Sequence, residues 1–180
     1  MISYIRQSIF CNKAVSPTYM QPKFKEVQRF TQWWLWALLI GVTLIPVYGV
    51  FQQLVLGEAF GDQPMSDTGL VIFLIFMLAF DYGFWMLKLA TEIDSQTIKV
   101  NFFPFAKREF QWSEVRNYEV LEYGFVGGWG IRLGTKYGTV YNTKGRMGLA
   151  LELADGSKYC IGTQKEQELA IFLQNIKQRK

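Results

Sequence analysis

The chain carries no charged side chain over the 28 residues from Phe30 to Gly57. As an α-helix this stretch would extend roughly 40 Å, whereas the hydrocarbon core of a bilayer is about 30 Å thick. Three tryptophans stand near its beginning, as in the aromatic belt at a membrane surface: Trp33, Trp34 and Trp36. The pattern predicts a first transmembrane helix at residues 30–57.

A second apolar stretch follows at residues 70–90, interrupted only by Asp81 and Lys88. The connection between the two stretches, residues 58–69, reads EAFGDQPMSDTG and is rich in turn-forming residues. Its length suits a tight loop outside the membrane. We therefore expect a hairpin of two transmembrane helices.

The distribution of charge predicts the orientation of this hairpin. Five basic residues precede it (Arg6, Lys13, Lys23, Lys25 and Arg29), and Lys88 lies at its end, whereas the loop contains only acidic charges. Basic flanks remain on the cytoplasmic side of a membrane. Residues 1–29 and the C-terminus are therefore expected in the cytoplasm and the loop outside.

Residues 23–34 have two readings. Phe24, Val27 and Phe30 recur at i, i+3 and i+6 among basic residues, which favours a short interfacial helix leading into the first span. The alternative is a basic flank with no separate role.

Asp81 is the carboxylate expected inside the membrane, where a charge is costly and is by default a candidate for function. One reading is structural: the group is protonated, hydrated near the inner surface, or paired with Lys88 at i+7. The other reading is a proton relay or a contact with a partner helix.

From Thr91 onward the hydrophobic period changes to two, which indicates short β-strands separated by turns. Seven runs are expected to be strands: 97–103, 109–112, 117–123, 129–133, 139–142, 149–153 and 158–161. Thr163 and Glu166 have the spacing of a capping box before a C-terminal amphipathic helix. The expected fold is a membrane α-helical hairpin followed, at residues 91–180, by a bent sheet or barrel of about seven antiparallel strands capped by a helix.

The composition excludes several classes of chemistry. The chain has no histidine, and its two cysteines, Cys11 and Cys160, form neither a metal motif nor a disulfide framework. Glu119 and Glu122 fall on opposite faces of one expected strand, so they form no acid–base pair. The glycines from Gly128 to Gly134 match GxGxxxG but precede strand-like sequence, which predicts a turn or bulge and no dinucleotide site. We expect no catalytic residues, no metal and no cofactor.

The segment EYGFVGGWGIRLGTKYGTVYNTKGRMGLALELADGSKYCIGTQKEQEL (residues 122–169), with FKEVQRFTQWW, FGDQP and TEID upstream, resembles bacterial membrane proteins in which a two-helix hairpin precedes a pleckstrin-homology (PH) domain. The resemblance covers the chain from about residue 23 onward. It implies a PH-like domain on the cytoplasmic face of the bacterial inner membrane, and no particular activity. PH domains bind inositol phosphates in a basic pocket at the first β-turn. That turn is expected here at residues 93–97, which contain neither Lys nor Arg.

Three functions follow from this sequence. The first is a non-enzymatic membrane protein whose PH-like module binds a protein partner or a second copy, through four residues expected at the surface: Trp129, Arg132, Tyr141 and Asn142. The second is an anionic-lipid sensor that uses Lys107, Arg108, Lys144 and Arg146. The third is an oligomeric transport component that uses Asp81. Nucleic-acid binding is not expected, because the region after Ala90 has only 13 basic against 10 acidic residues.

Overall fold

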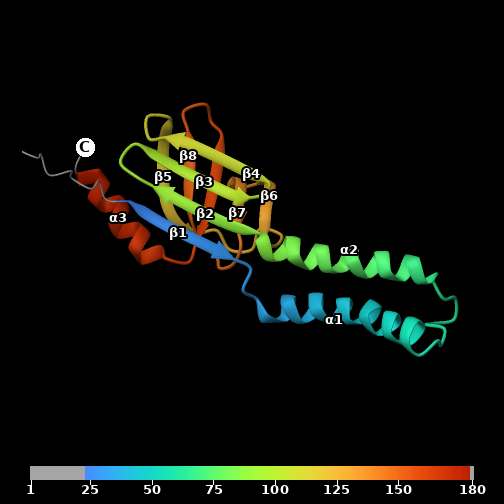
Figure 1. Ribbon diagram of the computed structural model, residues 1–180. Helices are drawn as coiled ribbons and strands as arrows, with labels where there is room; N and C mark the ends of the chain where they lie inside the picture. The colour runs from blue at the N-terminus through green and yellow to red at the C-terminus, as the bar shows by residue number, and fades with distance from the viewer. Residues whose placement is uncertain (1–22, 179–180) are drawn as a thin grey trace, which may run out of the picture.

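The computed structural model describes residues 23–178 and combines a helical hairpin with a sheet-rich domain, here called the β domain (Figure 1). The hairpin consists of α1 (Trp33–Val50), a π-helical continuation η1 (Phe51–Val55) and α2 (Asp67–Met86). Arg6 and Lys13, two of the basic residues from which the orientation is predicted, lie outside the described residues.

The hairpin is inserted between two paired strands of the β domain. Strand β1 (Phe24–Arg29) pairs antiparallel with β2 (Lys88–Ile93), in a register that runs from Phe24↔Ile93 to Arg29↔Lys88. The chain leaves the sheet at Arg29, forms both helices and returns at Lys88. The end of the β domain marked by this residue pair is called the helix-proximal end.

The prediction of a short interfacial helix around Phe24 is therefore wrong. Residues 24–29 alternate between buried and exposed positions, and Val27, one of the three expected apolar contacts, is 64% exposed. Phe24 and the polar residues Glu26 and Gln28 form the buried face. Because β2 supplies backbone hydrogen-bond partners, the N–H and C=O groups of β1 form hydrogen bonds in the extended conformation, as they would have done within a helix.

The first sheet has the order β1-β2-β3-β4, with β3 at Thr97–Phe103 and β4 at Ala106–Gln111. All of its neighbours are antiparallel. The turn at residues 93–97 thus joins β2 to β3. From the sequence, this turn was expected to be the first connection of the domain. In the structure it is the second connection of the sheet.

The second sheet has the order β5-β8-β9-β7-β6. Its strands are β5 (Val115–Glu122), β6 (Gly130–Thr135), β7 (Gly138–Asn142), β8 (Met147–Leu153) and β9 (Lys158–Thr163). The pair β7–β9 is parallel and the other pairs are antiparallel. The seven strands expected from the sequence correspond to β3–β9, but the expectation that all of them are antiparallel is wrong, because β7 and β9 are parallel neighbours. Strands β1 and β2 are additional.

One hydrophobic core joins the two sheets and the C-terminal helix α3 (Glu166–Gln178). Leu169, Leu173 and Ile176 of α3 are buried in it, as the amphipathic pattern predicts. Aromatic packing extends the core to the hairpin: the Phe30 ring lies 5.2 Å from the Phe84 ring of α2. The hairpin and the β domain therefore share packed residues at their junction.

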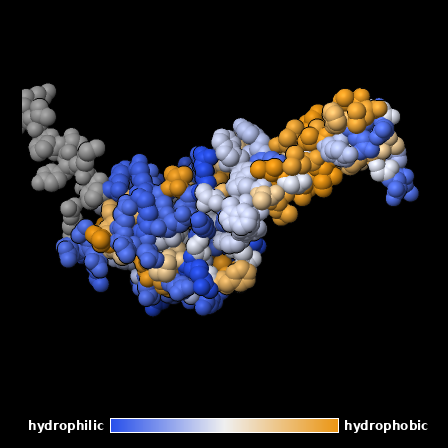
Figure 2. Space-filling view, turned by 90° about the horizontal axis from the view of Figure 1, so that it is seen from below, coloured by the Kyte–Doolittle hydropathy of each residue, from blue (hydrophilic) through white to orange (hydrophobic). Residues whose placement is uncertain are grey.

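Both long helices are long and apolar enough to cross a membrane, and little of either is buried. Many of their large aliphatic side chains are exposed; Leu38, Ile45, Ile72 and Ile75 are all more than half exposed. Figure 2 shows the hairpin as a mostly hydrophobic surface beside a largely hydrophilic β domain. A core helix of a soluble protein would instead bury such side chains.

Candidate functional site

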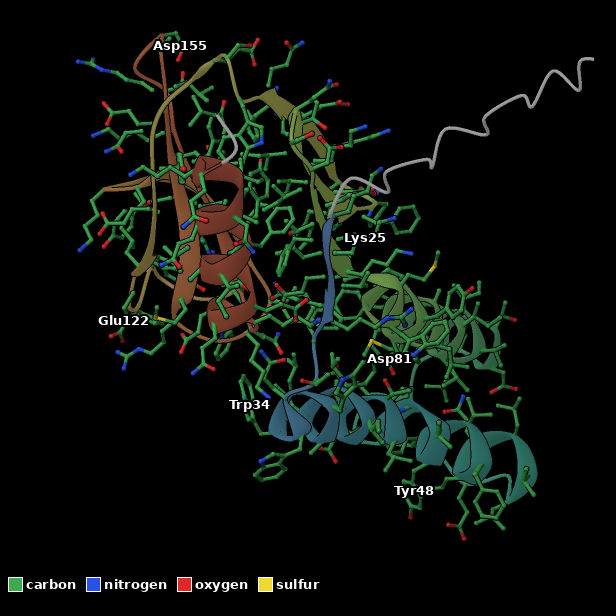
Figure 3. All side chains as sticks on the ribbon, turned by 90° about the vertical axis from the view of Figure 1, so that its left-hand side faces the viewer. Lys25, Trp34, Tyr48, Asp81, Glu122 and Asp155 are labelled. Carbon is green, nitrogen blue, oxygen red and sulfur yellow. The ribbon has the colours of Figure 1, made fainter. Side chains whose placement is uncertain are left out.

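A polar pair links the two long helices. The Thr43 hydroxyl of α1 donates a hydrogen bond of 2.8 Å to Oδ2 of Asp81, which Figure 3 labels on α2. Thr43 is 6% exposed, and Oδ1 of Asp81 is buried without a hydrogen-bond partner among the described residues. Asp81 thus holds α1 and α2 together and keeps one oxygen available to a further donor.

The expected pairing of Asp81 with Lys88 is not among the ion pairs of residues 23–178. The Lys88 ammonium lies instead 5.6 Å from the centre of the Phe103 ring. Lys88 belongs to β2, and its register partner there is Phe103 of β3, so its side chain lies over the neighbouring strand.

A second polar cluster lies at the base of the hairpin, where β1 meets the second sheet. Glu26, only 5% exposed, accepts a 2.6 Å hydrogen bond from the Thr163 hydroxyl and a 2.8 Å bond from the Gln164 backbone N–H. Thr163 in turn accepts a bond from the backbone N–H of Lys165, just before α3. A carboxylate close to a helix N-terminus is favoured by the exposed N–H groups and the helix dipole.

Two glutamines extend this cluster toward α1. Gln28 donates to the Gly162 carbonyl (2.7 Å) and accepts from the Thr143 hydroxyl (3.1 Å). Gln32, the residue before α1, donates to the Thr143 carbonyl at 2.7 Å. We call Glu26, Gln28, Gln32, Thr143 and Thr163 the polar joint. It connects the strand that leads into α1 with the ends of β7 and β9.

Sequence reasoning missed the polar joint. Its signal was the alternation of Phe24, Glu26, Gln28 and Phe30 with exposed residues, a period of two that the basic residues obscured. The capping box expected at Thr163 and Glu166 is wrong, because Thr163 is the last residue of β9 and α3 begins only at Glu166. The Thr163 hydroxyl instead accepts from the Lys165 N–H and donates to Glu26 of β1.

The four residues expected to form a partner surface divide into two pairs. Tyr141 and Asn142 are 3% and 2% exposed, so neither can contact a partner directly. They lie on β7 in the middle region of the second sheet, where β6 and β9 cover both of its edges. Asn142 instead donates to the Tyr123 hydroxyl and to the Gly128 carbonyl.

Trp129 and Arg132 remain partly accessible. The Trp129 ring is 37% exposed and lies 5.7 Å from the Trp34 ring of α1. Arg132 donates to the Trp129 carbonyl at 3.0 Å and folds over Gly128, whose φ is +118°. Of the glycines from Gly128 to Gly134, Gly128 lies in the loop between β5 and β6, and Gly130 and Gly134 belong to β6, whose register with β7 shifts between Arg132 and Thr135. The expected turn or bulge is thus present, and the loop places Trp129 against the beginning of the hairpin.

The four basic residues expected to bind lipid headgroups do not form one site. Lys107 and Arg108 are exposed on β4, and Lys107 lines a shallow depression on the outer face of the first sheet. Lys144 and Arg146 lie between β7 and β8, and Arg146 lines a different depression, of about 560 Å³, beside the start of α3. Arg146 also pairs with Glu122 at 3.6 Å.

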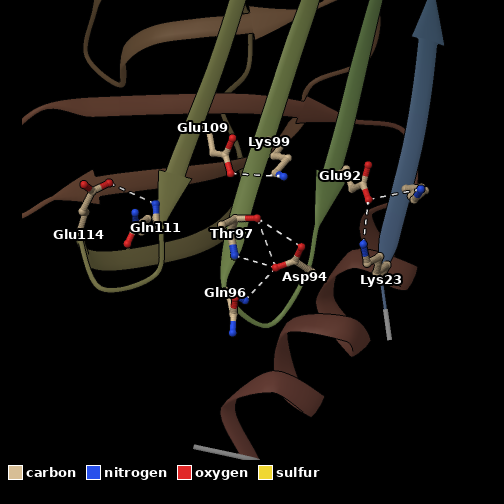
Figure 4. A network of polar contacts seen from close by, with 10 residues as sticks. Lys23, Glu92, Asp94, Gln96, Thr97, Lys99, Glu109, Gln111 and Glu114 are labelled. Carbon is tan, nitrogen blue, oxygen red and sulfur yellow. Dashed lines mark hydrogen bonds and ion pairs between the residues drawn. The ribbon is translucent and has the colours of Figure 1, made fainter. Parts of the chain in front are cut away.

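The opposite end of the β domain, called the far end, carries acidic turns (Figure 4). Backbone hydrogen bonds join the β2–β3, β4–β5 and β8–β9 turns, from Trp112 to Gln96 and from Ala154 to Glu114. Burial raises the pKa of Asp94, but hydrogen bonds from the backbone N–H groups of Gln96 and Thr97 outweigh it and leave the pKa below its usual value.

Glu92, on β2 next to the far end, forms ion pairs with Lys25 and Lys23 at 3.3 and 3.4 Å. The hydrogen bond from Lys25 is the main cause that lowers the pKa of Glu92. Because β2 runs from the hairpin at Lys88 to the far end at Ile93, Glu92 lies away from the junction with the helices.

The described residues offer binding surfaces and no reactive cluster. No group of three or more His, Cys, Asp or Glu within residues 23–178 is placed to hold a metal ion. Burial raises the pKa of the Cys160 thiol to about 12, so this thiol remains protonated and unreactive near neutral pH.

Comparison with known proteins adds no relative. The sequence matches no protein-family model, and no curated protein matches it. A functional assignment therefore depends on the geometry described above.

Proposed function

We propose that the chain is a non-enzymatic protein of the bacterial inner membrane whose two helices span the bilayer and hold a PH-like module against the cytoplasmic leaflet, where the module binds a protein partner or a second copy. The observation that carries this proposal is the position of the hairpin. Both apolar helices arise from adjacent strands, at Arg29 and Lys88, and expose their aliphatic side chains. Lipid is the environment in which such a surface is stable.

The strand order supports the PH-like part of the proposal. If the β6–β7 hairpin is treated as an insertion, seven antiparallel strands remain, in the groups β1-β2-β3-β4 and β5-β8-β9, and α3 follows them. This is the arrangement that the family resemblance implies. The hairpin α1–α2 then occupies the connection between the first two strands, where PH domains have their basic ligand pocket. Attachment through helices takes the place of phosphoinositide recognition.

Charge supports a cytoplasmic β domain. Arg29 and Lys88 flank the hairpin at the helix-proximal end, whereas the connection between the helices carries Glu58 and Asp62 and no basic residue. The positive-inside rule assigns the basic end to the cytoplasm.

Cysteine accessibility tests this topology. In a Cys11→Ser background, Asp62→Cys in the loop between the helices should react with a membrane-impermeant maleimide in intact cells. Asp155→Cys at the far end should react only after permeabilisation. Cys160 is buried and serves as the internal background. Reaction of both introduced cysteines from the same side, or release of the protein by alkaline carbonate, would contradict the proposal.

Native mass spectrometry of the gently solubilised full-length chain tests the binding role. A defined heteromer or homo-oligomer supports an interaction module. A monomer that retains only anionic lipid favours the lipid-sensing alternative.

A transport role for Asp81 is a second candidate, favoured by its buried and unpartnered Oδ1. Two spans in one chain form no path, so this role requires oligomers. It predicts that Asp81→Asn, which keeps an acceptor for Thr43, abolishes proton-coupled flux in reconstituted vesicles without changing the oligomer.

A further inference from the structure

Two phenylalanines on separate loops are exposed at the helix-proximal end of the β domain. Phe105 lies in the turn between β3 and β4 and is 71% exposed. Phe125 lies in the loop between β5 and β6 and is 80% exposed. Both are far more exposed than the core phenylalanines Phe102 and Phe110, at 2% and 4%.

Contacts with residues of the hairpin place both loops beside it. Phe103, at the beginning of the first turn, is the register partner of Lys88, which follows α2. Trp129, in the same loop as Phe125, contacts Trp34 of α1. Figure 1 shows the β3–β4 turn and β6 at the end of the β domain from which the helices extend. Phe105 and Phe125 are thus near the level at which the helices begin.

The helices contribute further exposed aromatic side chains at this level. Trp33 of α1 is 79% exposed, and Tyr82 and Trp85 of α2 are 60% and 54% exposed. Aromatic side chains concentrate at the boundary between headgroups and acyl chains, where a ring is buried and its polar atoms stay hydrated. Phenyl rings from two loops at the same level extend this belt from the helices to the β domain.

Basic residues lie beside the aromatic side chains at the helix-proximal end. Arg29 lies over the Trp85 ring at 5.4 Å and Lys88 over the Phe103 ring at 5.6 Å, so two cations accompany the aromatic residues. The turns of the far end carry Asp94, Glu114 and Asp155. An anionic leaflet attracts the cations of the helix-proximal end, whereas Lys23 and Lys25 near the far end are paired with Glu92.

We propose that Phe105 and Phe125 insert into the headgroup–acyl boundary of the leaflet that α1 and α2 enter, so that the β domain stands on the membrane on its helix-proximal end. The inference rests on the proposed function, because it requires the hairpin to span the bilayer. It goes beyond that function by making the β domain itself a lipid-binding element with a fixed orientation. The far-end turns then point into the cytoplasm.

Lipid quenching of a fluorophore tests the insertion. The full-length chain, in a Cys11→Ser background, is reconstituted into vesicles of phosphatidylcholine and phosphatidylglycerol. Four variants, each with one introduced cysteine beside the buried Cys160, carry an NBD label: Phe105→Cys, Phe125→Cys, Asp155→Cys and Phe76→Cys. Phe76 is 61% exposed on α2 and reports the hairpin, and Asp155 reports the far end. Lipids with a nitroxide near the top of the acyl chain are the quencher.

We expect several-fold stronger quenching at positions 105 and 125 than at 155, with blue-shifted emission at both. Quenching at position 76 without quenching at 105 and 125 overturns the inference and leaves the spanning hairpin intact. Absence of quenching at position 76 overturns the spanning hairpin itself. Equal quenching at 105, 125 and 155 also overturns the inference, because the domain would then lie on its side.

Discussion

Thr163 donates a 2.6 Å hydrogen bond to Glu26 across 137 residues of sequence, and this bond ties the strand before the hairpin to the last strand of the β domain. Gln28 and Gln32 repeat the connection closer to α1. A movement of the hairpin relative to the second sheet must break these buried bonds. The polar joint therefore makes the helices and the β domain a mechanically coupled unit.

Glu26→Ala tests this coupling. The substitution leaves the buried Thr163 hydroxyl and the part-buried Gln164 N–H without their acceptor, and we expect a loss of about 2–3 kcal/mol in the free energy of unfolding. Near-UV circular dichroism of the detergent-solubilised chain during denaturation measures it. Glu92→Ala, which removes a partly exposed ion pair from the adjacent strand, is the matched control and should cost about 0.5 kcal/mol or less.

A double-mutant cycle with Thr163→Val assigns the loss to the bond itself. A coupling of about 1 kcal/mol or more between the two positions is expected for groups in direct contact. Additive losses would mean that Glu26 stabilises the fold without acting through Thr163.

The interhelical bond is the second target. Thr43→Val keeps the shape of the side chain and removes the donor to Asp81. Hydrogen bonds between helices in lipid contribute about 0.5–2 kcal/mol, so we expect a comparable destabilisation of the hairpin in reversible unfolding from bicelles. Thr68→Val, exposed in the first turn of α2, is the control and should have no effect. Equal effects of the two variants would contradict a structural role for the Thr43 hydrogen bond.

The sequence was most informative where the hydrophobic pattern is local. Two long apolar stretches predicted both helices, and a period of two with turn residues predicted β3–β9. Strand β1 was missed because its partner β2 lies beyond the whole hairpin, and no local pattern reports such pairing. Glu26 and Gln28 look like surface residues until β9 is placed against them. Tyr141 and Asn142 were assigned to the surface because their neighbours β6 and β9 were unknown.

The Asp94 turn predicts a pH dependence. Its carboxylate accepts hydrogen bonds from Gln96 and Thr97, and its pKa in the folded protein is lowered. A carboxyl group with a lowered pKa stabilises the fold above its unfolded pKa, and the contribution is lost as the pH falls through the folded pKa. The melting temperatures of the wild type and Asp94→Asn should differ most at neutral pH and converge below about pH 4. Asp62→Asn, in the connection between the helices, controls for the loss of one charge, and a constant difference at all pH values would contradict the assignment.

Glycine is required in the second sheet for two different reasons, a positive φ and a close backbone neighbour, and substitutions of Gly138 and Gly134 distinguish them. Both have positive φ, +74° and +68°, which an alanine adopts at a cost of about 1–2 kcal/mol. At Gly134 a Cβ would enter open space, whereas at Gly138 it would collide with the Lys158 carbonyl of the parallel neighbour β9. Gly138→Ala should therefore lower the free energy of unfolding by about 4 kcal/mol or more, and Gly134→Ala by the conformational cost alone. Because the collision involves backbone, β7 can relieve it only by separating from β9. Equal losses in the two variants, measured by chemical denaturation, would show that β7 and β9 are not packed this closely.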